Sequence, residues 1–148
     1  MDNPLVRTVE SELHKLGMGN AKLVRESYNP KNFGNAEAVY MLGNLQLRFV
    51  RDRGDDTIEI GSSIDPRQFY ILDDIAVWMG WLSLGELLRY DTSINFDEPP
   101  PGPILNLDKA LSHIVRDFAK LDSAFAANEI VSTNAKLKDI ERQRMKQP

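Results

Sequence analysis

The sequence predicts one α+β domain: a small antiparallel sheet of three to five strands, with an N-terminal helix and C-terminal helices packed on one face. Apolar residues recur at helical spacing near both ends of the chain, whereas alternating apolar and polar runs separated by a turn occupy the middle. The 148 residues can bury a core without cross-links, and 42% apolar and 27% charged residues are typical of a globular chain. Without a visible internal boundary, we expect a single domain over residues 1–148.

The first expected element is a helix over residues 4–16. Asn3 and Pro4 favour a helix start, because the Asn side chain accepts hydrogen bonds from free amides and Pro is tolerated in the first turn. Gly17 and Gly19 are typical of a helix end. Four apolar residues recur at helical spacing and would form one face of this helix: Leu5, Val9, Leu13 and Leu16.

Strands are expected next, beginning with a short one at residues 22–28 and continuing at residues 38–40. The clearest alternation has polar Gln46 and Arg48 between Leu45, Leu47 and Phe49. Apolar alternation resumes at residues 57–60 after a charged run, which predicts an antiparallel hairpin. Because the charged run at residues 51–56 is longer than two residues, we expect a wide turn with Gly54 at positive φ.

After the strands, residues 72–79 fit a helix, since Asp73 and Asp74 would oppose the helix dipole in its first turn and Gly80 would end it. A short helix is expected from Ser83 to Tyr90. Residues 91–105 are expected to form a loop, because the proline segment at 99–103 cannot continue a helix.

The longest expected helix runs from about residue 107 to 127. Its apolar residues follow intervals of 4, 3, 4, 3 and 4, an unbroken heptad stripe of Leu107, Leu111, Ile114, Phe118, Leu121 and Phe125. A sparser apolar pattern continues at Ile130, Leu137 and Ile140. Residues 141–148 are polar and are expected to fray.

Charge and composition point toward a protein partner. The net charge is −4, and residues 73–108 contain seven Asp/Glu and one Lys/Arg. A concentrated acidic segment favours a basic protein partner, because complementary charge steers association. Nucleic acid is not expected as the main partner, and the basic residues of 136–146 are interpreted as a solvated helix face. The absence of Cys, of a signal sequence and of an apolar run of roughly 20 residues leads us to expect a cytoplasmic protein that does not contact membranes.

No catalytic, cofactor or metal site is expected, so we predict a protein that is not an enzyme. His14 and His113 fit partly exposed helix positions, and neither lies beside a sequence typical of a nucleophile. The pair Asp55-Asp56 is interpreted as turn chemistry and the pair Asp73-Asp74 as a helix start. A metal or hydrolytic site from Asp52, Asp55 and Asp56 is the alternative, although the spacing lacks a calcium-loop pattern.

One group of residues predicts a binding surface. Aromatic side chains anchor interfaces, and acidic rims suit basic partners, so we expect a partner-binding surface formed by Trp81, Tyr90, Asp91, Asp97 and Glu98. The competing interpretation places Trp78 and Trp81 in the core over the sheet. Whether the proline segment at 99–103 belongs to the binding surface stays open.

The run from Leu45 to Gly54, followed by Ile58–Ile60, Phe69-Tyr70 and Leu72–Ile75, resembles small bacterial proteins, among them immunity proteins of polymorphic or contact-dependent toxin systems. The resemblance covers about a quarter of the chain and contains no site motif. It implies an inhibitor that blocks a toxin by occlusion. The alternatives are a self-associating structural or adaptor subunit that forms a homodimer through the heptad stripe, and a hydrolase or metal-binding protein that uses the loop carboxylates.

Overall fold

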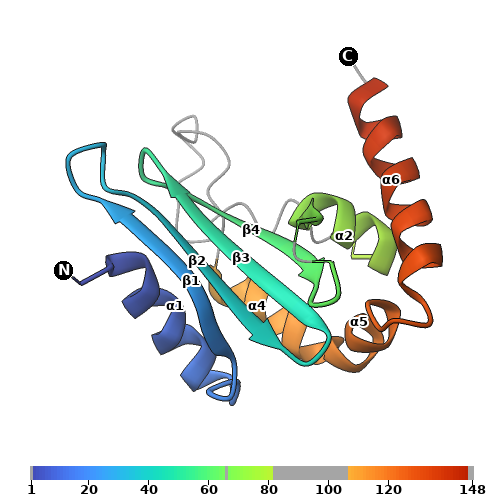
Figure 1. Cartoon of the computed structure of the whole chain (residues 1–148), viewed down its shortest axis with the longest axis horizontal. Coiled ribbons are helices and arrows are strands. Elements are labelled where there is room, and N and C mark those ends of the chain that lie inside the picture. Colours follow the sequence, from blue (N-terminus) through green and yellow to red (C-terminus); the bar gives the residue numbers. More distant parts are fainter. Residues whose placement is uncertain (1, 66, 82–106, 147–148) are drawn as a thin grey trace, which may run out of the picture.

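The structure is a computed structural model that describes residues 2–65, 67–81 and 107–146. The chain forms one five-stranded antiparallel sheet in the order β1-β2-β3-β4-β5, with a helix before it and helices after it (Figure 1). This arrangement confirms the predicted α+β class. The described elements are α1 (Pro4–Lys15), β1 (Lys22–Asn29), β2 (Asn35–Leu42), β3 (Leu45–Asp52), β4 (Asp55–Ser62), β5 (Phe69–Ile71), α2 (Leu72–Met79), α4 (Leu107–Arg116), α5 (Phe118–Ala124) and α6 (Ile130–Lys146).

Helix α1 begins and ends almost where the local signals predict. The Asn3 side chain accepts a hydrogen bond from the Leu5 amide at 3.1 Å, and Asn3 Nδ2 donates to the carbonyl of Ser27 on β1. The helix ends at Lys15, and Leu16 is its C-cap. Its buried residues are Leu5, Val9 and Leu13, as the periodicity predicts.

One face of the sheet supplies the core. Cross-strand pairing aligns Tyr40 with Leu47, Leu47 with Ile60, and Ile60 with Tyr70, so that one buried row crosses four strands. The helices α1, α2, α4, α5 and α6 all contribute buried side chains to the same apolar cluster. The core therefore lies between this face and the described helices.

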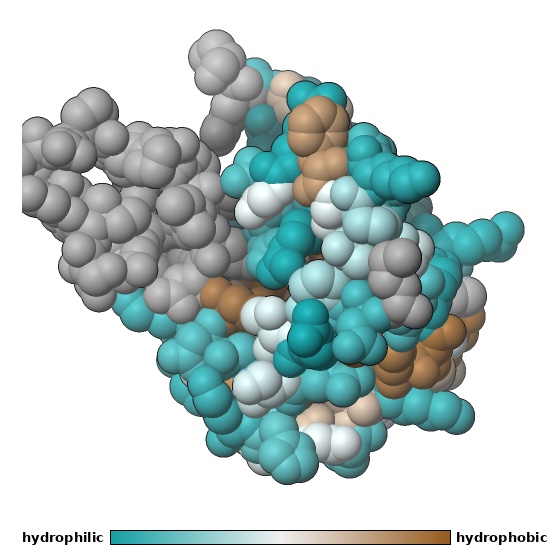
Figure 2. All heavy atoms as spheres, turned by 90° about the vertical axis from the view of Figure 1, so that its left-hand side faces the viewer, coloured by the Kyte–Doolittle hydropathy of each residue, from teal (hydrophilic) through white to brown (hydrophobic). Residues whose placement is uncertain are grey.

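The hairpin turn between β3 and β4 corrects the expectation of a wide loop. The turn has only two residues, Arg53 and Gly54, because Asp52 already pairs with Asp55. Gly54 has φ +86°, as predicted. The charged run was misleading because Arg51 and Asp56 pair across the two strands instead of forming a loop. Figure 2 looks onto the end of the molecule that holds this turn, a mostly hydrophilic surface with separate hydrophobic patches.

The prediction of a single long helix over residues 107–127 is wrong. The helix breaks at Asp117, which separates α4 from α5 and has φ −105° and ψ 21°. The Asp117 carboxylate accepts hydrogen bonds from the indole of Trp81 at 2.7 Å and from Arg116 at 3.0 Å. The stripe is nevertheless buried, with its most enclosed members at Leu111, Ile114, Leu121 and Phe125.

Helix α6 continues through residues 141–146, where fraying was expected. The guanidinium of Arg144 bonds to the carboxylate of Asp74 on α2, and this contact holds the end of α6. Nearer its start, α6 is tied to the sheet by the Tyr70 hydroxyl, which donates to Asn134 Oδ1 at 2.7 Å. Among the described helices, none has the length and apolar character needed to cross a membrane.

Candidate functional site

Of the five predicted partner-binding residues, the structure describes Trp81. Trp81 is only 3% exposed, so its assignment to an interface is wrong. Its indole donates to Asp117, and its ring packs edge-on against His113 at 5.5 Å between centroids, which closes the core between α2 and α4. Tyr90, Asp91, Asp97 and Glu98 lie outside the described residues, as do the helix expected at 83–90 and the proline segment.

Trp78 is half-buried and makes an edge-to-face contact with Phe125, with 6.1 Å between ring centroids. It belongs to the side chains that pack against the core cluster. Both tryptophans therefore support the interpretation in which they close the core.

The loop carboxylates do not come together as metal ligands. Asp56 forms a bidentate ion pair with Arg51, with nitrogen–oxygen distances of 2.7 and 2.9 Å. Asp52 and Asp55 face each other as the last strand pair before the turn. Within residues 2–65, 67–81 and 107–146, no three His, Asp or Glu side chains are placed to hold one metal ion.

The two histidines lie on different helices, His14 on α1 and His113 on α4. His113 Nδ1 lies 2.9 Å from the Lys109 carbonyl oxygen, one helical turn away. His14 lines a hollow of about 210 Å³ together with Glu10 and Tyr40. Burial and the neighbouring charge of Glu10 raise the pKa of the Tyr40 hydroxyl, which donates to Glu10 Oε1 at 3.4 Å. Tyr40 therefore stays protonated at neutral pH and serves as a structural donor.

The candidate site is the sheet face opposite the core, here called the polar face. Charged side chains of four neighbouring strands meet on it in the alternating order Arg25, Glu37, Arg48 and Glu59. Arg25 Nε lies 2.8 Å from Glu37 Oε1, and Arg48 Nη2 lies 2.7 Å from Glu37 Oε2. Arg48 Nη1 also pairs with Glu59 Oε1. These contacts form a continuous ion-pair row across β1, β2, β3 and β4.

Strand register produces the ion-pair row. Arg48 and Glu59 are directly opposite each other on β3 and β4, and opposite charges at such positions attract. Glu37 is opposite Val50, so it reaches Arg48 along the diagonal. The sequence shows these residues as the polar positions of alternating strands, but it does not show which of them meet.

The pairing keeps Glu37 and Arg48 ionised. Burial by itself would raise the pKa of Glu37, but hydrogen bonds and charge from Arg48 and Arg25 outweigh burial, so the pKa of Glu37 is lowered. Burial would lower the pKa of Arg48, but the hydrogen bonds that Arg48 donates to the carboxylates of Glu37 and Glu59 raise it. A carboxylate with a lowered pKa is a weak base, so this arrangement suits recognition better than proton transfer.

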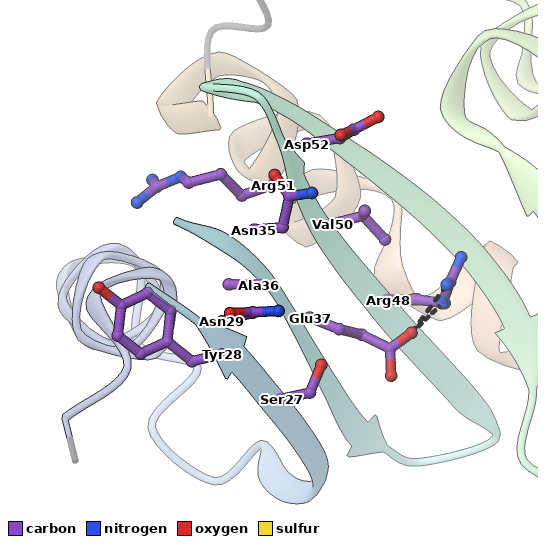
Figure 3. A pocket seen from close by; sticks show the side chains of 10 residues that line it. All are labelled: Ser27, Tyr28, Asn29, Asn35, Ala36, Glu37, Arg48, Val50, Arg51 and Asp52. Carbon is purple, nitrogen blue, oxygen red and sulfur yellow. Dashed lines mark hydrogen bonds and ion pairs between the residues drawn. The ribbon is translucent and has the colours of Figure 1, made fainter. Parts of the chain in front are cut away.

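Two shallow hollows lie on the polar face and share Arg48. The first, about 340 Å³, has the lining shown in Figure 3, where Glu37 and Arg48 reach toward each other while Tyr28 and Arg51 extend to the other side. The second, about 430 Å³, is lined by Arg25, Arg48, Glu59, Arg67, Gln68 and Phe69. The Arg48 guanidinium carbon lies 5.9 Å from the Phe69 ring centroid, so an aromatic ring supports the centre of the row.

The polar face thus offers fixed donors and acceptors on a broad, slightly hollowed surface. Such a surface matches interfaces better than enclosed small-molecule sites, which surround most of their ligand. Comparison with known proteins adds no function to this geometry: no family model, curated protein or solved structure matches the chain.

Proposed function

We propose that this chain is a non-enzymatic protein-binding protein of the immunity type, which blocks a toxin by covering part of its surface. The polar face is the contact surface in this proposal, and the acidic segment at residues 73–108 favours a basic partner. The observation that carries the proposal is the ion-pair row of Arg25, Glu37, Arg48 and Glu59, on the sheet face away from the shared core.

The ion-pair row supports specific recognition because its charges are already held in place. A partner that places matching charges over the row loses little side-chain entropy on this chain, whereas a mismatched partner meets like charges. Alternation of sign also makes the match depend on register. The row therefore favours one orientation of a partner over a slipped one.

The alternative of self-association through the heptad stripe is not favoured. Leu111, Ile114, Leu121 and Phe125 are at most 1% exposed and belong to the shared core. A stripe used inside the molecule does not bind a second copy without unfolding. The hydrolase or metal alternative gains no support either, because Asp56 is engaged with Arg51 and its neighbours do not gather with it.

The test is a capture experiment from lysate of the source organism, with the tagged chain as bait and mass spectrometry as readout. The test variant is Arg48→Gln with Glu59→Gln, which removes the centre of the row without changing net charge. The matched control is Asp139→Asn with Arg142→Gln, which removes an exposed pair on α6. Circular dichroism confirms that each variant is folded.

We expect one basic protein at a stoichiometric level with the wild type and the control, released by salt, and lost with the polar-face variant. Cells that express the captured protein should grow only when this chain is co-expressed. Equal capture by the polar-face variant would contradict the assignment of the contact surface. Recovery of only untagged copies of the chain would contradict the immunity proposal and favour self-association.

A further inference from the structure

Two hairpin turns lie side by side at one end of the sheet (Figure 1), and each holds a bulky residue in an unusual conformation. The β1–β2 turn closes with Phe33 and Gly34 at φ +57° and +70°, and the β3–β4 turn with Arg53 and Gly54 at φ +54° and +86°. Within the described residues, Phe33 and Arg53 are the non-glycine residues with positive φ. The two bulky residues thus occupy equivalent positions in adjacent turns.

Positive φ at the first central position of such a turn strongly favours Asn, Asp or Gly. A side chain as large as Phe or Arg is disfavoured there, because its Cβ crowds the backbone. Strained residues persist when the surrounding structure holds them, and they gather at functional sites. Neither Phe33 nor Arg53 is explained by what hairpin closure needs.

The two side chains contact each other. The Arg53 guanidinium carbon lies 5.3 Å from the Phe33 ring centroid, and the Arg53 amide donates to Asn35 Oδ1 at 2.8 Å, which joins the two turns. Phe33 is 71% exposed, far more than its apolar ring alone would favour. In the described part of the chain, the Arg53 guanidinium makes no hydrogen bond or ion pair, so its N–H donors remain open.

We propose that Phe33 and Arg53 form a docking anchor for a partner-protein segment that carries a carboxylate next to an apolar side chain. The carboxylate takes the planar donor fork of Arg53, and the apolar side chain packs on the exposed ring of Phe33. Arg and aromatic residues are the groups that most often carry binding energy at interfaces. The choice of a protein as partner rests on the proposed function, whereas the anchor does not depend on the polar face.

Local charge favours one carboxylate over a polyphosphate. Asp52 and Asp55 flank Arg53 in its own turn, and the whole chain carries a net charge of −4. A nucleic-acid backbone would bring several phosphates against these carboxylates, whereas a single acidic side chain needs only the fork of Arg53. An overall basic partner can supply such a residue within its interface.

The experiment uses a phage-displayed library of random 12-residue peptides, selected on the full chain. The variants are Phe33→Asn and Arg53→Asn, because Asn tolerates positive φ and preserves the turns. The control is Val131→Asn, which removes an apolar side chain that is 80% exposed on α6. Thermal unfolding of each variant is measured beside peptide binding.

We expect enriched peptides that share an Asp or Glu beside a large apolar residue. A synthetic copy should bind either turn variant about tenfold more weakly than wild type or the control, and its Asp→Asn or Glu→Gln form should lose as much. The turn variants should melt at the same temperature as wild type or higher, because relief of strain offsets the lost ring contact. This combination of weaker binding and retained stability separates an anchor from a structural contact.

The inference would be overturned by enriched peptides that bind the Phe33→Asn/Arg53→Asn double variant equally well, by no enrichment over that variant, or by a clearly lower melting temperature for both single variants. Tight binding of an oligothymidine probe that both variants abolish would assign the turns to nucleic acid and also overturn it. If peptides require the turns but lysate yields no partner, the proposed function fails while the anchor stands. If the captured partner requires Arg48 and Glu59 but not the turns, only the anchor fails.

Discussion

Replacing Arg144 with Gln should destabilise the chain, because it removes the partner of a carboxylate that is almost completely enclosed. Asp74 is 1% exposed, and its two oxygens accept bonds from Arg144 Nε at 2.9 Å and Nη2 at 3.3 Å. The bidentate hydrogen bonding raises the pKa of Arg144, which therefore stays charged. Without Arg144, water must reach the carboxylate, or the end of α6 must separate from α2.

The expected size of the effect follows from the burial of each partner. Loss of one partner in a fully buried pair costs about 3–5 kcal/mol. The Arg144 side chain is 42% exposed, so solvent screens part of the interaction, and about 1–3 kcal/mol is expected for Arg144→Gln. Asp74 also lies in the first turn of α2, where the helix dipole partly compensates a lone carboxylate.

A double-mutant cycle with Asp74→Asn isolates the pairwise interaction. We expect a coupling energy of about 1–2 kcal/mol from urea unfolding followed by circular dichroism and Trp fluorescence. The control cycle uses Asp139 and Arg142 on the same helix, whose side chains are 59% and 71% exposed and 3.7 Å apart. Its coupling should stay below about 0.5 kcal/mol. Equal coupling in the two cycles would refute the role given to burial of Asp74.

Three further predictions concern the row, a turn and the core. Arg48→Gln should raise the pKa of Glu37, since Arg48 supplies the strongest of the effects that lower it; carbonyl ¹³C NMR titration measures this. The pKa of Glu37 is lower in the folded state than in the unfolded state. The ionised carboxylate therefore stabilises the fold above the unfolded-state pKa, and this stabilisation is lost as the pH falls through the folded-state pKa. In the Arg48→Gln variant the loss of stability should begin at a higher pH. Gly43→Ala should destabilise by more than about 1 kcal/mol in urea unfolding, because φ is +59° and the new Cβ would overlap Asp122 Oδ1. Leu121→Ala, at a fully buried position, should cost about 2–5 kcal/mol by the same assay, and a cost near zero would contradict its place in the core.

Local signals predicted the elements that depend only on neighbouring residues. The cap of Asn3 on α1 and the end of α2 at Gly80, which has φ +79°, both follow from chemistry within one helical turn. The break between α4 and α5 does not, because Asp117 bonds to Trp81, which lies 36 residues earlier in the chain. An unbroken heptad pattern continues through that break, so periodicity alone hides it.

The candidate site was predictable in composition but not in geometry. Alternation placed Arg48 on the polar side of its strand, while the charged run at 51–56 was mistaken for a loop. Only the register shows that Arg51 meets Asp56, that Arg48 meets Glu59, and that Glu37 joins Arg48 along the diagonal. The burial of Trp81 was not predictable for a related reason, since the sequence indicates that an indole is large and apolar but not whether it lies in the core or on the surface.

The polar face and the two turns differ in whether their arginine is already paired with carboxylates, and this difference separates their proposed roles. The guanidinium of Arg48 is engaged on both sides by Glu37 and Glu59, so a partner gains little net energy by replacing those contacts and is selected mainly by its match to the row. The guanidinium of Arg53 lies against the Phe33 ring with its donors open, so a partner carboxylate adds hydrogen bonds without breaking any within the described chain. Substitutions in the row should therefore remove the match and with it capture of the partner, whereas substitutions in the turns should weaken the binding of a partner that still matches the row. Affinities of the captured partner for the Arg48→Gln/Glu59→Gln and Arg53→Asn variants, measured beside a mismatched protein of similar charge, separate these two effects.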